Sequence, residues 1–253
     1  MSATEGVRIV LTEVLASFGI KFLLDLPCGD VHWIQSLDFV EISRSSSFFF
    51  SSPSSTSLSS LSTPPMLTYM GADISPFLIE RNNKRLEMTR SAKNISIDGS
   101  VEEDGDVLLL RAMVQSLDGR VSFSTLDLVN GSLPNPEQEQ SPSLLFCRHM
   151  MIHLLPVDNL AALKNVQASG FSYMMATTHV RADENLLLLE GRTPRLLGHK
   201  INLFRSPYCL RDPIRLYRDS YGRAEGDEGD EDLFMGLWEL GPRSGPLMRD
   251  GGC

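Results

Sequence analysis

The sequence predicts a single α/β domain built on a doubly wound, mostly parallel sheet of seven strands. Short apolar segments that resemble buried strands alternate with segments of helical periodicity up to residue 178. Acidic residues follow the first three of these strands, and the last two strand candidates follow each other without a helix between them. Alternating strands and helices indicate parallel pairing, whereas two consecutive strands indicate an antiparallel hairpin at one edge.

The first helix and the first strand are expected within residues 5–26. Residues 20–26 form a short apolar run that contains an acid, as is typical of a strand buried on both faces. The next four residues, PCGD, form a tight turn, and residues 31–37 can start another helix. Apolar residues recur at helical spacing ahead of Gly19, which predicts a helix over residues 5–18; they are Val7, Val10, Leu11, Val14 and Phe18.

The later elements repeat the same order. Ser75 and Pro76 are the N-cap and first-turn proline of a helix that runs to about Arg90. A further helix is expected over residues 158–169, where Gly170 ends it. The remaining strand candidates are residues 66–74, 121–128, 143–147, 171–178, 214–217 and 233–240.

Two insertions and a tail are expected to interrupt or follow this domain, which spans residues 1–240. Residues 41–65 are rich in serine and contain prolines, so they bury too little surface to offset the entropy of ordering. We predict a disordered insert there; an intron retained in the predicted protein is the alternative explanation. Residues 93–120 carry an acidic patch with little pattern and are expected to form a loop, and residues 241–253 are expected to be a disordered tail.

Composition limits the classes of function. The charge of 23 basic and 32 acidic residues gives −9, which argues against a protein that binds duplex nucleic acid. No apolar run reaches the roughly 18 residues of a membrane span, and the N-terminus lacks the pattern of a signal peptide. The four cysteines, Cys28, Cys147, Cys209 and Cys253, are widely spaced, so we expect neither a zinc site nor disulfides, and a reduced, cytoplasmic setting.

Acidic residues mark the ends of the first three predicted strands. Asp25 and Asp30 flank the first turn, Asp73 ends the second strand and Asp127 follows the third. Ligands of open α/β sheets bind beyond the carboxyl ends of the strands, where the strand order reverses. Acids in this order suit a nucleoside, with the second binding the ribose hydroxyls and the third the adenine amino group. The simpler interpretation is that each acid caps the helix that follows it.

Several motifs together resemble a group of class I S-adenosylmethionine-dependent methyltransferases. These proteins have a D-x-P-C-G-D first motif and a C-R-D/H-x-x-x-H-L stretch after the fourth strand. The resemblance covers roughly residues 18–92 and 121–240, and it implies a Rossmann-like fold that binds S-adenosylmethionine. The motifs are LDLPCGD (24–30), YMGADI (69–74), LDL (126–128), LLFCRHMMIHL (144–154), YMMATT (173–178) and GLWEL (236–240).

The resemblance also implies a role for each matching position. The first turn would surround the methionine moiety, Asp73 would hold the ribose, and Ile74 would pack against the adenine. Asp127 and Leu128 would line the adenine pocket, and Cys147 would lie at the methyl-donor end. The positions implied to bind the cofactor are Asp25, Pro27, Cys28, Gly29, Asp30, Asp73, Ile74, Asp127, Leu128 and Cys147.

Candidate catalytic residues follow the fourth strand. His149 and His153 lie four residues apart and are the first candidates for a base, ahead of Asp30 and His32 in the first loop. Arg148 could orient an anionic substrate. Packing or helix capping are the alternative roles for these histidines, and a metal site lacks a matching third ligand.

The predicted activity is methyl transfer from S-adenosylmethionine to a small-molecule or glycan-type substrate, with no nucleic-acid or membrane partner. The alternative is a non-catalytic cofactor-binding or scaffold protein with a degenerate methyltransferase fold. Two features favour this alternative. Ser143 stands where the family has an acid, and two insertions interrupt the domain. A nicotinamide dinucleotide is disfavoured, because the first turn has one glycine and two acids that would repel a diphosphate.

Overall fold

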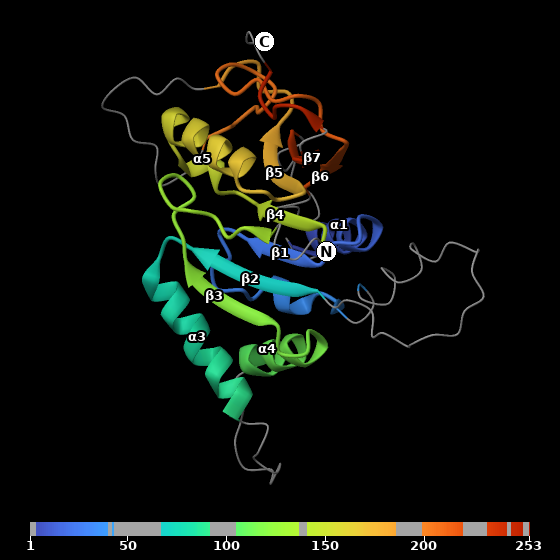
Figure 1. Ribbon diagram of the computed structural model, residues 1–253, viewed down its shortest axis with the longest axis vertical. Coiled ribbons are helices and arrows are strands. Elements are labelled where there is room, and N and C mark those ends of the chain that lie inside the picture. The colour runs from blue at the N-terminus through green and yellow to red at the C-terminus, as the bar shows by residue number, and fades with distance from the viewer. Residues whose placement is uncertain are drawn as a thin grey trace, which may run out of the picture.

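The structure, a computed structural model, describes residues 4–39, 42, 67–91, 105–136, 141–185, 199–219, 232–241, 244–249 and 253. These residues form one seven-stranded sheet (Figure 1). Its strands are β1 (Phe22–Asp25), β2 (Thr68–Asp73), β3 (Val121–Thr125), β4 (Ser143–Cys147), β5 (Tyr173–His179), β6 (Arg215–Arg218) and β7 (Leu233–Glu239). The order across the sheet is β3-β2-β1-β4-β5-β7-β6.

The pairing confirms the predicted fold class. Strands β1 to β5 pair in parallel, and the order reverses between β1 and β4. Strand β7 is antiparallel to both β5 and β6, so the last two strands form the expected hairpin. The result is a Rossmann-like, doubly wound sheet with an antiparallel C-terminal edge.

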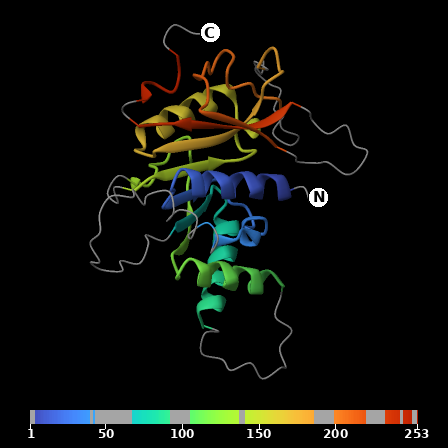
Figure 2. The ribbon, with the colours of Figure 1, turned by 90° about the vertical axis from the view of Figure 1, so that its right-hand side faces the viewer.

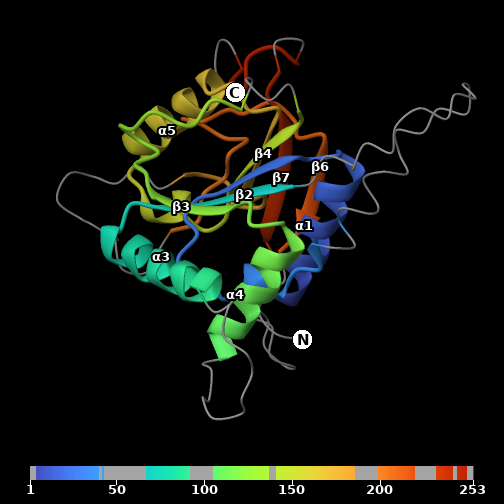
Figure 3. The same ribbon diagram turned by 60° about the horizontal axis from the view of Figure 1, so that its bottom comes forward.

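Helices cover both faces of this sheet. The helices are α1 (Glu5–Ser17), α3 (Pro76–Ser91), α4 (Gly105–Ser116) and α5 (Pro156–Ala168), with short 3-10 turns η1 (Ile34–Ser36) and η4 (Met151–His153). Figure 2 looks onto the face that carries α1, with α4 on the same side. Figure 3 shows α5 across the strands from α1 and α4.

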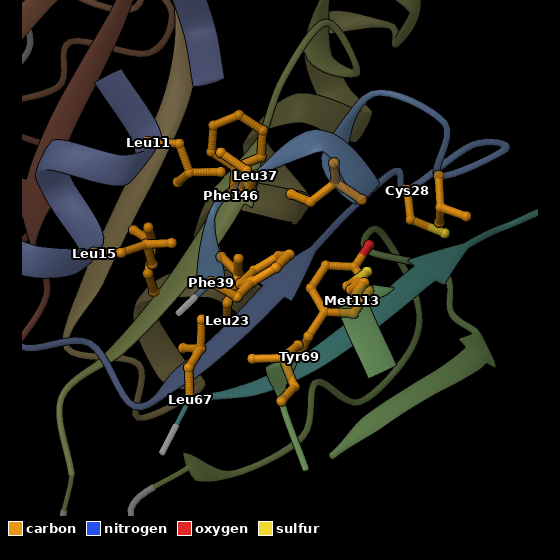
Figure 4. Packing of buried hydrophobic residues seen from close by; sticks show 14 of the residues in the cluster. Leu11, Leu15, Leu23, Cys28, Leu37, Phe39, Leu67, Tyr69, Met113 and Phe146 are labelled. Carbon is orange, nitrogen blue, oxygen red and sulfur yellow. The ribbon is translucent and has the colours of Figure 1, made fainter. Parts of the chain in front are cut away.

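Strand alternation divides the core between the two faces. Leu23 of β1 points into the cluster formed with α1, η1, α3 and α4, whereas the adjacent Leu24 points into the cluster with α5. Figure 4 shows the first cluster, to which α1 contributes Leu11, β2 contributes Tyr69 and α4 contributes Met113. This burial on both faces explains why the central parallel strands are almost wholly apolar.

One expected loop contains a helix. Residues 93–120 were predicted to lack regular structure, but α4 occupies Gly105–Ser116. Its core-facing residues are Leu110, Met113 and Val114, and Leu117 follows just after it; together they repeat at helical spacing. The acidic residues that precede this helix obscured its short apolar stripe. Residues 92–104 lie outside the described residues.

The helix expected within residues 31–37 is also wrong. Val31 has a φ of 59°, in the left-handed region, so the backbone cannot continue as a right-handed helix at this residue. A single 3-10 turn, η1, follows at Ile34–Ser36. The predicted insert 41–65 lies outside the described residues except for Ile42.

The C-terminal segment departs from two expectations. Leu247 is buried in the core cluster that Leu24 forms with α5. The Arg249 amide donates to the Cys209 carbonyl at 2.9 Å. Cys209 also forms a disulfide with Cys253. The predictions of a disordered tail and of no disulfide are therefore wrong for these residues, because both features depend on contacts between segments that are distant in sequence. In the described part of the chain, every helix is too short or too polar to cross a membrane.

Candidate functional site

The first turn lies at the point where the strand order reverses. The Leu26 amide donates to the Phe146 carbonyl of β4 at 2.9 Å, and the Cys28 amide donates to the Ala72 carbonyl of β2 at 2.8 Å. The ends of the two strands that flank β1 thus hold the turn in place. Its Leu26–Pro27 peptide bond is cis.

Two residues of this turn have left-handed backbones. Gly29 has a φ of 57°, which glycine adopts at no steric cost. Val31 has a φ of 59° although a β-branched residue is disfavoured in this region. Strained backbones of this kind concentrate at functional sites, where the surrounding structure maintains them. Val31 therefore holds a backbone conformation that favours glycine.

Asp73 joins the first turn to the end of β2. Its Oδ2 atom accepts a hydrogen bond from the Gly29 amide at 3.2 Å, and its Oδ1 atom accepts one from the Ser75 amide at 2.9 Å. Asn82 of α3 donates to the Gly29 carbonyl at 2.9 Å. The side chain of Asp73 is buried, and the Gly29 bond brings its carboxylate and the first turn together.

Asp25 lies at the end of β1 and is also buried. The Tyr69 hydroxyl donates to its Oδ2 atom at 3.0 Å. Burial raises the pKa of Asp25 to about 8; the Tyr69 bond and the charge of Arg148 oppose this rise, and the charge of Asp73 adds to it. The same burial raises the pKa of the Cys147 thiol to about 12, so this cysteine is a packing residue at the edge of the site.

An apolar cavity of about 80 Å³ opens beside the first turn. It lies between the loops that follow β1, β2, β3 and β4. Ile74 is 67% exposed at its rim, so the structure leaves the expected adenine-packing side chain open to solvent. The residues that line the cavity are Leu26, Pro27, Ile74, Leu126, Asp127, Leu128, Val129, Met150 and Leu154.

Asp127 lines this cavity but directs its carboxylate into its own loop. Its Oδ1 atom accepts from the Val129 amide at 2.8 Å, and its Oδ2 atom accepts from the Asn130 side chain at 3.0 Å. The pKa of Asp127 is lowered, and the hydrogen bond from the Asn130 side chain is the main cause. Asn165 of α5 donates to the carbonyls of Leu128 and Val129 and thereby holds the cavity wall.

Arg148 and His149, which follow β4, meet a residue that the sequence did not single out. Arg148 donates from Nε and Nη2 to the two carboxylate oxygens of Asp219, at 2.9 and 3.0 Å. The Nε2 atom of His149 lies 3.3 Å from Oδ2 of Asp219. Burial opposes ionisation of Asp219, but its contacts with His149 and Arg148 lower its pKa to about 2.

The structure separates the two predicted bases. His153 is exposed on η4, whereas His149 contacts the buried Asp219. His153 instead neighbours His199, whose pKa is lowered by burial and then by the charges of His153 and His179. Asp30 and His32 lie exposed in the first loop, where His32 pairs with Asp106 of α4 at 2.9 Å. Among the described residues, no group of three potential ligands could hold a metal ion.

Three contributors to this site were missed from the sequence. Asp219 follows the predicted strand at 214–217, and an acid after a strand was the available signal. Tyr69 and Asn82 carried no signal, because their contacts depend on the parallel register of β1 with β2 and on the packing of α3.

Comparisons with known proteins give fold similarity alone. No protein-family model matches the sequence, and no curated protein matches it either. Among solved structures, the methyltransferase domain of bacterial CtHen1-CN is 14% identical, with a TM-score of 0.48, over 93% of this chain and 98% of that chain. The N-methyltransferase NodS from Bradyrhizobium japonicum WM9, in complex with S-adenosyl-l-homocysteine, is 12% identical, with a TM-score of 0.49, over 94% and 88%. At this level, similarity does not transfer an activity, a ligand or a substrate.

Proposed function

We propose that this chain binds S-adenosylmethionine at the carboxyl edge of the sheet and transfers its methyl group to a small-molecule or glycan-type acceptor. The hydrogen bond between the Gly29 amide and Asp73 carries this proposal. It fixes a left-handed turn and a buried carboxylate side by side where the strand order reverses, which is where open α/β sheets bind ligands.

The residues at this edge fit a nucleoside. A carboxylate has about four lone-pair sites, and backbone amides use only part of those on Asp73, so ribose hydroxyls can donate to the remainder. The apolar cavity beside Ile74 suits a flat base. Its volume of about 80 Å³ is below the range of whole-ligand pockets, so it would take the adenine ring while the rest of the ligand lies over the first turn.

The charges at this edge favour a cationic ligand over a diphosphate. Asp30 and Asp73 flank a turn that has one glycine, so a pyrophosphate would meet carboxylates instead of a glycine-rich helix start. Bound S-adenosylmethionine would supply a methyl group on a positively charged sulfur. The chain would orient the acceptor through Arg148 and His149, because alignment of the reacting atoms is the main requirement of an in-line transfer.

The net charge limits the class of acceptor. The formal net charge of −9 disfavours a nucleic-acid substrate. We expect a small-molecule or glycan-type acceptor that reaches the edge near His149.

Calorimetry with purified protein tests the cofactor site. We expect S-adenosylmethionine and S-adenosylhomocysteine to bind and a nicotinamide dinucleotide not to bind. Asp73→Ala should weaken binding more than tenfold, because a charged hydrogen bond contributes roughly 1.5–3 kcal/mol. Asp212→Ala is the matched control, since its carboxylate is 88% exposed and pairs with Arg249 at the surface.

Equal affinity of the wild type and Asp73→Ala would remove the ribose assignment, and preference for the dinucleotide would remove the proposal. Single-turnover transfer of a labelled methyl group to small-molecule and glycan acceptors then separates an enzyme from a non-catalytic binder.

A further inference from the structure

A buried cluster of charges lies beside the candidate cofactor turn. We use the name Asp219 cluster for Asp219, Arg148 and His149. Its atoms are connected by the two Arg148 hydrogen bonds to the carboxylate and by the 3.3 Å contact of His149 Nε2. Arg148 also acts electrostatically on Asp25, the last residue of β1, which precedes the first turn.

The three side chains of the Asp219 cluster differ in their exposure to solvent. The Asp219 side chain is 0% exposed, that of Arg148 is 11% exposed and that of His149 is 22% exposed. A carboxylate buried so completely is retained only where cations and hydrogen bonds satisfy it. The histidine is thus the member that a bound molecule can reach, and the aspartate can act only through its neighbours.

The backbone of His149 is held in an unusual conformation. Its φ is 58°, in the left-handed region, and its amide donates to the Thr177 hydroxyl of β5 at 2.9 Å. Thr177 therefore fixes the main chain of His149, and the ring lies with Nε2 3.3 Å from the Asp219 carboxylate. A strained residue whose main chain is held in place is typical of a functional site.

We propose that Asp219 is a positioning residue of the methyl-acceptor site, which holds the His149 ring with its proton on Nε2 so that Nδ1 can take the proton of the acceptor. This inference rests on the proposed function. An ionised carboxylate only accepts hydrogen bonds, so the neutral ring beside it carries its proton on the nitrogen that faces it. The low pKa of Asp219, about 2, keeps the carboxylate ionised at neutral pH.

Bound S-adenosylmethionine would supply the methyl group in this step. Its methyl–sulfur bond would break, and the electron pair would stay on sulfur as S-adenosylhomocysteine forms. A bond forms between the methyl carbon and the acceptor oxygen or nitrogen, and the acceptor proton moves to Nδ1 of His149. The resulting imidazolium remains paired with the Asp219 carboxylate and later releases its proton to water.

Nuclear magnetic resonance of protein labelled with ¹⁵N-histidine tests the geometry without an acceptor. His149 signals, assigned by their loss in His149→Gln, should show the Nε2-protonated form in the wild type at pH values where the ring is neutral. In Asp219→Asn the amide can donate as well as accept, so the signals should shift towards a mixture of both tautomers. His179 is the internal control: its Nδ1 atom accepts from the Ile201 amide at 3.1 Å, so its signals should be the same in the wild type and in Asp219→Asn.

A second measurement places the histidine at the site. Addition of S-adenosylhomocysteine should shift the His149 signals in the wild type. An Nδ1-protonated ring in the wild type would overturn the inference even if Asp219→Asn failed to fold. Unchanged His149 signals in a folded Asp219→Asn, or no shift when calorimetry shows that S-adenosylhomocysteine binds, would also overturn it. Absence of binding in calorimetry would instead count against the proposed function.

Discussion

At the residue scale, the Asp25–Tyr69 pair is the clearest case of burial setting the chemistry of a side chain. The carboxyl lies at the end of a central strand, with a tyrosine hydroxyl as its hydrogen-bond donor and Asp73 nearby. Burial disfavours the ionised form, so the pKa rises to about 8. The folded protein therefore retains a proton on Asp25 over a pH range where the unfolded chain has lost it.

Asp25 should make the free energy of unfolding fall as pH rises. Below about pH 4 both states are protonated, and the contribution of Asp25 is fully present; it is lost progressively until the pH passes about 8. Between pH 5 and pH 7 the wild type should lose about 1.4 kcal/mol per pH unit relative to Asp25→Asn. Urea unfolding of both proteins at several pH values measures this difference.

Tyr69→Phe gives an independent check on the same carboxyl. The Tyr69 bond lowers the pKa of Asp25, so its removal should extend the loss of stability to pH values above 8. For the preceding prediction, parallel plots of unfolding free energy against pH for the wild type and Asp25→Asn would show that the buried carboxyl does not hold its proton.

At the element scale, the close approach of β2 to β3 depends on a glycine. A Cβ atom at Gly71 would lie 2.7 and 2.8 Å from the Phe123 ring and 3.0 Å from the Tyr69 hydroxyl. Gly71→Ala should therefore lower the free energy of unfolding by about 1–3 kcal/mol, as overpacking does in a well-packed core. Gly105→Ala is the matched control, because a Cβ atom there meets no atom within 4 Å. Equal urea midpoints for the two variants would contradict this packing.

The elements also show how far sequence patterns predict this fold. Strand β4 was predicted with its observed bounds, since SLLFC is a continuous apolar run. Helix α4 was missed, because its apolar stripe is short and follows an acidic segment. Sequence patterns therefore locate an element where apolar residues dominate its segment. They fail where a short apolar stripe lies next to charged residues.

At the scale of the whole molecule, a disulfide joins Cys209 to Cys253 across 44 residues of sequence. Removing a cross-link of this length should cost about 2–4 kcal/mol of unfolding free energy. We expect Cys253→Ser to show this loss under oxidising conditions and to match the wild type once the wild type is reduced. A difference that persists in reducing agent would mean that the serine perturbs the tail by another route.

The sequence by itself determined the strand order along the chain, the first turn and the acids at the strand ends. These features are local, because each depends on the periodicity or the turn residues of one segment. Only the tertiary structure decided which side chains meet. Arg148 donates a hydrogen bond to Asp219, which is 71 residues away in the sequence, and Tyr69 donates one to Asp25, which is 44 residues away. Such pairs depend on the strand order across the sheet and on its register, which bring distant residues together and are not encoded in the spacing of any single segment.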